Sequence, residues 1–181
     1  LLRFVIDGED YEPDIRTVGT LIKEYVPFLK ERGILLGIEN HDRFKAKELA
    51  SLLDSVGDDH VGVCLDCVNS LGAGEGIDHV SQVLAPYTFN LHIKDYHIER
   101  LPHKMGFIVE GCPAGEGMTN VPRLLETLAP YNRCESAVLE QWVVPEPSIE
   151  ATVLKEHRWA EQGLRYLKQQ PVFNTKSYNT L

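Results

Sequence analysis

A regular alternation of short apolar segments with longer helical segments is the feature that most constrains the fold of this chain. Five apolar segments have the length and composition of strands buried on both faces, at residues 2–6, 34–39, 61–66, 87–94 and 137–142. A segment of helical periodicity lies between each consecutive pair, and parallel strands need such crossover connections. The alternation therefore predicts an α/β fold, which is either a barrel or a doubly wound sheet.

The helical segments are bounded by residues that end helices. We expect helices at residues 15–32, 45–56, 77–84, 122–128 and 148–167. Gly33 and Gly57 follow the first two segments and favour the left-handed backbone found after helix ends. Pro27 predicts a kink or a local break inside the first helix. Residues 171–181 are polar and are expected to form a C-terminal tail.

Length and charge restrict the class of partner. The 181 residues are enough for one domain with its own core. Lys and Arg total 18 and Asp and Glu total 27, which gives a net charge of −9. That charge disfavours binding to nucleic acid or to an anionic membrane surface. No apolar run approaches the roughly 18 residues of a membrane span, and we expect no secretory signal peptide.

The four cysteines lack the spacing of a zinc or redox site. Cys64 and Cys67 form a C-x-x-C pair, but Cys112 and Cys134 are 22 residues apart and do not supply a second pair. We interpret Cys64 as a small buried residue at the end of a strand. Since nothing in the sequence requires an oxidising compartment, the expected location is the reduced cytoplasm.

Four of the predicted strands end in a side chain that can bind a metal. These side chains are Glu39, Asp66, His92 and Glu140. Each follows a bulky aliphatic residue, which we expect to face the outer helices, so the metal-binding candidates point to the opposite face. They lie at the carboxyl ends of the strands, where parallel α/β proteins build their sites. Three carboxylates and one imidazole at one place would repel one another unless a cation lay among them.

The alternative for any one of these residues is an ordinary strand-terminal side chain with a local hydrogen bond. Equivalent positions on four strands favour a shared site instead. Carboxylate oxygens and imidazole nitrogens suit Mn²⁺, Mg²⁺, Co²⁺ or Zn²⁺.

The residues around these strand ends also carry a resemblance to a known family. The relevant segments are Gly37-Ile38-Glu39-Asn40-His41, Leu65-Asp66-Cys67-Val68-Asn69, Leu91-His92-Ile93-Lys94-Asp95 and Leu139-Glu140-Gln141-Trp142. They resemble the xylose isomerase-like TIM barrels, which include sugar epimerases, hydroxypyruvate isomerase, inosose dehydratase and endonuclease IV. The resemblance covers residues 1–167.

The resemblance implies a TIM (β/α)8-type barrel of which the chain holds the last five βα units. Residues 1–170 would then form a partial barrel, followed by a tail at 171–181. A complete barrel has about 250 residues, so three βα units are expected to be missing at the N-terminus. The open strand edges would be covered by that missing segment or by another copy in a homo-oligomer.

By the same resemblance, one divalent cation is held by Glu39, Asp66, His92 and Glu140, with Mn²⁺ as the first expectation. In the isomerases and epimerases, the two glutamates also exchange a proton with the substrate carbon. A proton next to a carbonyl is weakly acidic, and a cation at the substrate oxygens stabilises the enediolate that forms. A carboxylate on each face can remove this proton and return it, so Glu39 and Glu140 are expected to have both roles.

Four further residues are candidates for the pocket. Lys94 can stabilise a developing oxyanion or hold a substrate hydroxyl, and the alternative is a solvated lysine paired with Asp95. His41 is expected to line the same pocket. Asn69 takes the place where several relatives carry a histidine, and it is expected to contact metal or substrate. Trp142 is either a packing residue or a platform for a sugar.

The segment at residues 95–117 is long for a βα loop and is expected to cover the site. A short strand is predicted within it at 107–109. Arg100 can bind a carboxylate or phosphate of the substrate. The alternative for Arg100 is a surface charge paired with Glu99 or Glu110.

The sequence thus favours a divalent-metal-dependent isomerase or epimerase that acts on a small keto sugar or polyol. A dehydratase or other lyase on a keto-polyol begins with the same proton abstraction and stays open, as does a non-catalytic barrel fragment. A DNA-repair endonuclease would need more metal-binding histidines and a basic groove, and the net charge of −9 argues against it.

Overall fold

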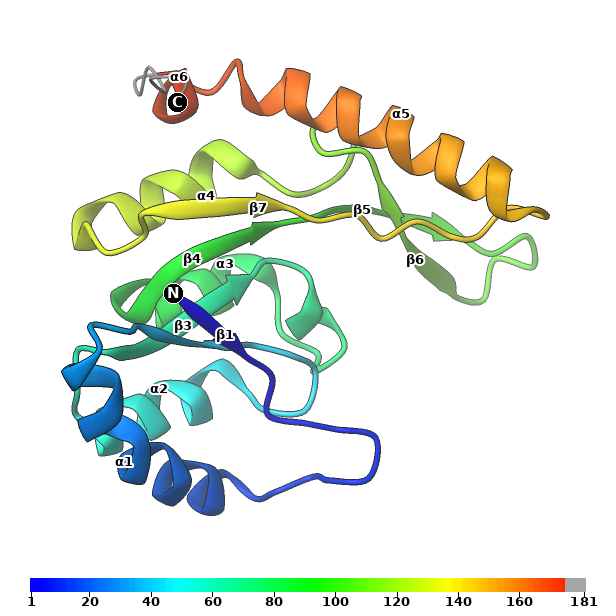
Figure 1. Ribbon diagram of the computed structural model, residues 1–181. Helices are drawn as coiled ribbons and strands as arrows, with labels where there is room; N and C mark the ends of the chain where they lie inside the picture. Colours follow the sequence, from blue (N-terminus) through cyan, green and yellow to red (C-terminus); the bar gives the residue numbers. More distant parts are fainter. Residues whose placement is uncertain (175–181) are drawn as a thin grey trace. The chain divides into compact units, whose positions relative to one another are not determined.

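The computed structural model describes residues 1–174, which divide into two compact units. The first unit comprises Leu1–His92 and Arg123–Val138, and the second comprises Ile93–Pro122 and the chain from Leu139 on. Figure 1 shows the elements of both units in chain order.

Five strands form one sheet, which lies almost wholly in the first unit. Their order follows the sequence: β1 (Leu2–Phe4), β2 (Leu36–Glu39), β3 (Val61–Asp66), β4 (Thr88–Ile93) and β7 (Ser136–Leu139). The pairs from β1 to β4 are parallel. Sequential order is typical of a barrel, whereas a doubly wound sheet shuffles its strands. The prediction of a partial TIM-type barrel is confirmed by this order.

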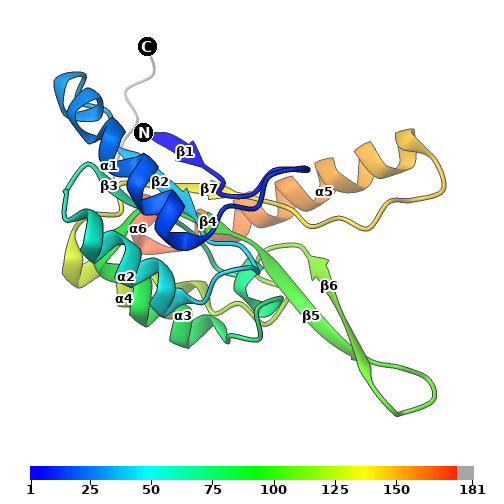
Figure 2. The same ribbon diagram turned by 90° about the horizontal axis from the view of Figure 1, so that it is seen from below.

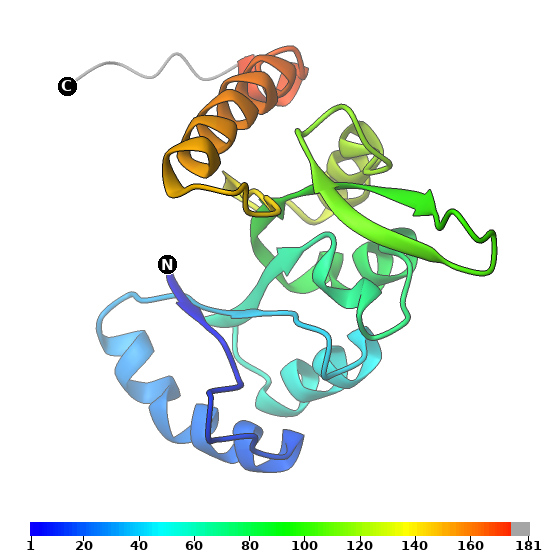
Figure 3. The same ribbon diagram turned by 90° about the vertical axis from the view of Figure 1, so that its right-hand side faces the viewer.

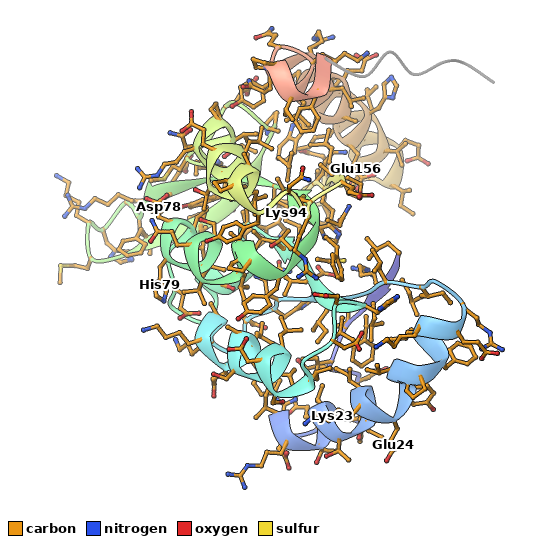
Figure 4. All side chains as sticks on the ribbon, turned by 90° about the vertical axis from the view of Figure 1, so that its left-hand side faces the viewer. Lys23, Glu24, Asp78, His79, Lys94 and Glu156 are labelled. Carbon is orange, nitrogen blue, oxygen red and sulfur yellow. The ribbon has the colours of Figure 1, made fainter. Side chains whose placement is uncertain are left out.

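Helices connect the strands as the periodicity predicts. The connecting helices are α1 (Ile15–Glu31), α2 (Ala46–Val56), α3 (Ile77–Leu84) and α4 (Val121–Leu128), and β7 is followed by α5 (Ile149–Leu167) and α6 (Pro171–Asn174). Figure 3 shows α1, α2 and α3 on one side of the strands of the first unit. Charged residues lie on the outer surfaces of these helices, such as Lys23 on α1 and Asp78 on α3 (Figure 4).

Helix α1 runs through Pro27 without interruption, so the predicted local break is wrong. Pro27 is exposed, and the carbonyl group that loses its partner there can bond to water. Gly33 and Gly57 adopt φ values of 60° and 63° after their helices, as expected. The first residues of the predicted tail form the short helix α6, and residues 175–181 lie outside the described part.

The two faces of the sheet differ in side-chain size. Ile38, Leu65 and Leu91 are fully buried and precede the strand-end residues. On the opposite face, Cys64 of β3 pairs in register with Asn90 of β4. A side chain at Gly37 would collide with the Cys64 sulfur, so this face has little space between strands. The alternation that the sequence predicts is therefore present.

The second unit contains a β-hairpin of which only part was predicted from the sequence. Strands β5 (Asp95–Arg100) and β6 (Phe107–Cys112) pair along their whole length in antiparallel register, and Figure 2 shows them as a long twisted ribbon. The predicted strand at 107–109 is confirmed as the first part of β6, but residues 95–100 form a strand and not the expected loop. The turn needs two positive φ values, at Lys104 and Gly106, and Gly106 allows one of them at low cost.

A buried carboxylate fixes the base of this hairpin. Asp95 is 2% exposed. Its Oδ1 accepts hydrogen bonds from the backbone N–H groups of Tyr96 and Thr119, and its Oδ2 accepts two more from Gly115 and Gly117. These bonds tie residues 113–119 to the start of β5. Asp95 is thus held by main-chain donors, while Lys94 forms an ion pair with Glu140.

Replacement of Asp95 by alanine should destabilise the protein. The change leaves four backbone N–H groups without the buried carboxylate that accepts their hydrogen bonds, and we expect the free energy of unfolding to fall by about 3 kcal/mol or more. Urea denaturation followed by circular dichroism measures it. The control is Asp78→Ala, which breaks an exposed ion pair with Arg123 and should cost less than about 1 kcal/mol. Equal effects for the two variants would contradict the anchoring role.

Among the described residues, no helix combines the length and the apolar character needed to cross a membrane.

Candidate metal centre

Three of the four predicted ligands come together at the ends of β2, β3 and β4. Glu39, Asp66 and His92 each offer a ligand atom, and these atoms lie within 4.8 Å of one another. Nδ1 of His92 is 3.5 Å from Oε1 of Glu39 and 3.9 Å from Oδ2 of Asp66. All three residues are buried. Neighbouring parallel strands in register therefore direct two carboxylates toward one imidazole nitrogen.

The orientation of Asp66 is set by the turn that follows it. Its Oδ1 accepts hydrogen bonds of 2.8 Å from the backbone N–H groups of Val68 and Asn69. Because these bonds hold one carboxylate oxygen, the other oxygen faces His92. The carboxylate cannot rotate without losing both bonds.

Asn40 connects the ends of β2 and β3, a role that was not predicted from the sequence. Its Oδ1 accepts the N–H of Asp66 at 2.7 Å, and its Nδ2 donates to the carbonyl oxygen of Asp66 at 2.9 Å. Asn40 is fully buried and also donates to Oγ of Ser70. The side chain therefore continues the sheet pairing by one residue and fixes the backbone that carries Asp66. The position of Asn40 directly after the candidate ligand Glu39 is the feature of the sequence that could have indicated this role.

Several donors surround the carboxylate of Glu39. Arg3 of β1 forms an ion pair with Oε2, while Nε2 of His41 and Nδ2 of Asn69 each lie 3.3 Å from Oε1. Burial alone would raise the pKa of Glu39, but hydrogen bonds with His41 and His92 and the charge of Arg3 hold the pKa well below its usual range. Glu39 is thus a carboxylate, the form in which it can bind a cation.

Cys64 lies on the same face as Glu39 but has the chemistry of a core residue. Burial, together with the nearby charge of Glu39, raises the pKa of the Cys64 thiol to about 11. The thiol is therefore protonated at neutral pH and is neither a nucleophile nor a ready metal ligand. The interpretation of Cys64 as a small buried residue agrees with this environment.

The second unit holds the remaining predicted ligand beside the predicted catalytic lysine. Glu140 directly follows β7, and its backbone N–H donates to the carbonyl oxygen of Ile93 at 3.0 Å. Oε2 of Glu140 is 2.9 Å from Nζ of Lys94, the residue after β4 that is labelled in Figure 4. Lys94 is thus a partially buried member of an ion pair, and not a solvated lysine.

Arg100 and Trp142 have positions that suit a binding role less well. Arg100 is the last residue of β5, about 20 Å along an extended strand from Lys94. It is exposed, and its Nε donates to the carbonyl oxygen of Lys104, so its contact is neither Glu99 nor Glu110. The backbone of Trp142 packs against Gly111 of β6, and 46% of the residue is exposed.

The donor atoms present fit a divalent cation. Two buried carboxylates and an imidazole nitrogen form a mixed oxygen and nitrogen set of the kind that binds Mn²⁺, Mg²⁺ or Zn²⁺. Two such carboxylates at close range are costly in the protein interior unless positive charge compensates them. Glu39 and Asp66 together match the charge of one divalent ion.

Comparison with known proteins agrees with this fold. A 3-oxo-isoapionate decarboxylase from Pectobacterium atrosepticum is 28% identical over 178 residues, which cover 98% of this chain and 65% of the decarboxylase. A xylose isomerase-like TIM barrel protein from Mycobacterium smegmatis, solved in complex with magnesium, has a TM-score of 0.62 at 16% identity, over 90% of this chain and 55% of that protein. D-psicose 3-epimerase from Clostridium cellulolyticum H10, solved with D-tagatose, has a TM-score of 0.64 at 14% identity, over 92% of this chain and 62% of the epimerase.

This chain spans less than two thirds of the length of each of these proteins. The profile of the family described as xylose isomerase-like TIM barrel matches residues 4–170. With the sequential strand order, this match shows that the chain belongs to the xylose isomerase-like TIM barrel family.

Proposed function

We propose that the protein is a divalent-metal-dependent enzyme that moves a proton next to the carbonyl of a small keto sugar, polyol or derived acid, as an isomerase or epimerase. The observation that carries the proposal is the convergence of Glu39, Asp66 and His92 at three neighbouring strand ends. The fold supports it, because isomerases and epimerases occur in this family. Mn²⁺ or Mg²⁺ is the proposed cation, and the magnesium bound by the M. smegmatis protein supports this class of metal.

We propose Glu140 as the fourth ligand. It follows β7, the neighbour of β4 in the sheet, and its N–H bonds to the residue after His92. When bound, the cation supplies Lewis-acid chemistry that stabilises negative charge on the carbonyl and adjacent hydroxyl oxygens of the substrate.

The proton transfer itself is assigned to the glutamates. Glu140 is the better candidate for the group that removes the proton, because 34% of its side chain is exposed, against 2% for Glu39. Lys94, which is paired with Glu140, can donate a hydrogen bond to a substrate oxygen as charge develops there. His41 and Asn69, which contact Glu39, are proposed to hold substrate hydroxyls at the other side of the site.

A second function is favoured by the 28% identity to the decarboxylase. Loss of CO₂ from a 3-oxo acid leaves the electron pair of the broken C–C bond on the carbon next to the carbonyl, as an enediolate or enolate. The same site can stabilise that charge, and a protonated Glu140 can then deliver a proton to the carbon. Decarboxylation is a lyase reaction, so it shares the class of the dehydratase alternative.

Solvent-deuterium incorporation distinguishes these reactions. The full-length protein loaded with Mn²⁺ is incubated in D₂O with a panel of keto sugars, keto-polyols and their 3-oxo acids, and the products are followed by nuclear magnetic resonance and mass spectrometry. An isomerase or epimerase incorporates deuterium next to the carbonyl without loss of CO₂ or water. CO₂ release with deuterium on the same carbon identifies the decarboxylase, and loss of water identifies the dehydratase. No reaction with any member, despite bound metal, would contradict the proposal and favour the non-catalytic fragment.

A further inference from the structure

Arg3 is a charged residue in the interior face of the barrel strands that the proposed reaction does not use. In the register of β1 and β2, Arg3 lies opposite Gly37, two residues before Glu39 on the same face. Because Gly37 has no side chain, the Arg3 side chain can extend along this face to the Glu39 carboxylate, with which it forms an ion pair. The side chain of Arg3 is 51% exposed, whereas that of Glu39 is 2% exposed.

The charges around this site do not balance once a divalent cation is present. Glu39 and Asp66 together neutralise the cation, and the Lys94–Glu140 pair of the second unit is neutral by itself. Arg43, which lines a small cavity together with Glu39 and His41, is already paired with Asp7. The guanidinium of Arg3 is therefore surplus positive charge next to the proposed metal site.

We infer that Arg3 binds a carboxylate group of the substrate, so that the natural substrate is a keto sugar acid and not a neutral keto sugar. The inference rests on the proposed function for the location of the reacting site. A guanidinium has five N–H donors, and the single contact with Oε2 of Glu39 leaves donors that a second carboxylate can accept in bidentate geometry. One carboxylate also matches the surplus charge of Arg3, whereas a phosphate dianion would exceed it.

The position of Arg3 makes it a specificity-determining residue. It lies one layer below the strand ends, beside one of the proposed ligands. A substrate that places its carbonyl at the cation would therefore place a carboxylate at Arg3 only if the two groups are a few atoms apart. A neutral sugar would leave the guanidinium without this partner and would lose affinity accordingly.

Equilibrium binding tests the inference without any need for turnover. The probes are 5-keto-D-gluconate, L-sorbose, which has a hydroxyl in place of the carboxylate, and L-sorbose 6-phosphate, which has a phosphate at the same carbon. Each is titrated by calorimetry into the full-length Mn²⁺-loaded protein. We expect the keto acid to bind at least about tenfold more tightly than L-sorbose, and Arg3→Met to remove this preference. Arg3→Lys should retain part of it, since the charge remains but the planar fork is lost.

The matched control is Arg32→Met, which removes an equal charge from the exposed end of α1, where Arg32 pairs with Glu31. It should keep the preference, and circular dichroism checks the fold of each variant. Equal affinity of the wild type for the keto acid and L-sorbose, including no measurable binding of either, would overturn the inference. The inference would also be overturned if Arg3→Met still preferred the keto acid over L-sorbose, or if the wild type preferred L-sorbose 6-phosphate through Arg3.

The result is separable from the proposed function. Arg3-dependent binding of the keto acid with no deuterium exchange on any substrate would support the inference and defeat the proposed reaction. Deuterium exchange on neutral sugars that is unaffected by Arg3→Met would support the proposed reaction and defeat the inference.

Discussion

His92→Ala should weaken the binding of a divalent cation by about 10²-fold or more. The imidazole is the only nitrogen donor proposed for the site, and its Nδ1 lies between the carboxylates of Glu39 and Asp66. Loss of outer hydrogen-bond partners alone typically costs 10- to 100-fold in metal affinity, so loss of a direct ligand should cost at least as much. Competition with a fluorescent chelator measures the affinity for Mn²⁺ and Zn²⁺.

The control for this variant is His60→Ala. His60 precedes β3 at its amino end and contacts Asp58, so it is a half-buried histidine at the opposite end of the strand. Metal affinity within about twofold of wild type is expected there. If His92→Ala also retained wild-type affinity while the protein stayed folded, the metal centre would not be at these strand ends.

Glu140→Gln should lower the rate of proton exchange by about 10²-fold or more, since general base catalysis typically contributes 10²- to 10⁴-fold. The amide is close in size to the carboxylate but cannot accept the proton, and it removes the ion pair with Lys94. Metal affinity should fall less than in His92→Ala, because Glu39, Asp66 and His92 remain. The rate is measured by deuterium incorporation into the substrate that the panel identifies, at saturating metal.

A matched control exists in the same unit. Glu146 also pairs with a lysine, Lys155, at 2.7 Å, but it does not follow a strand of the sheet. Glu146→Gln should exchange protons at the wild-type rate. Equal losses in both variants would show that the effect is one of stability, and a wild-type rate in Glu140→Gln would assign the base to another residue.

The sequence was sufficient for the sheet and for the candidate ligands because their signals are local. A strand buried on both faces has a nearly continuous apolar composition, and a polar residue at its end is conspicuous. For that reason Glu39, Asp66 and His92 could be placed by strand period alone, and the structure brings them together. The domain division into residues 1–170 and a tail remains a prediction.

The hairpin and its anchor could not be predicted in the same way. Residues of β5 alternate only weakly in polarity, and the acceptor role of Asp95 depends on N–H groups up to 24 residues away. Every residue except proline has a backbone N–H group, so residue types do not reveal which of these groups bond to Asp95. An aspartate beside a lysine favours an ion pair when it is considered locally, but burial and four amide donors determine its role here.

The contacts of Arg3 and Asn40 depend on how neighbouring strands are aligned in the sheet. This register cannot be predicted from local sequence patterns either. Arg3 reaches Glu39 across 36 positions of sequence, and it does so because β1 pairs with β2 in a register that puts Gly37 beside it. Asn40 bonds to both backbone groups of Asp66 because the ends of β2 and β3 are level. A shift of one residue in either pairing would turn these side chains to the other face.

The Asp95 anchor has a consequence for how this protein can diversify. Its carboxylate binds residues 113–119 solely through main-chain amides, so the architecture of that turn is independent of most side chains that it displays. Glu116 and Met118 are exposed and can be exchanged at little cost. Gly117 cannot, since an added side chain there would collide with Asp95 itself. Substitutions in this turn, whether from mutagenesis or from evolution, can therefore change its chemistry while the hydrogen bonds to Asp95 preserve its backbone conformation.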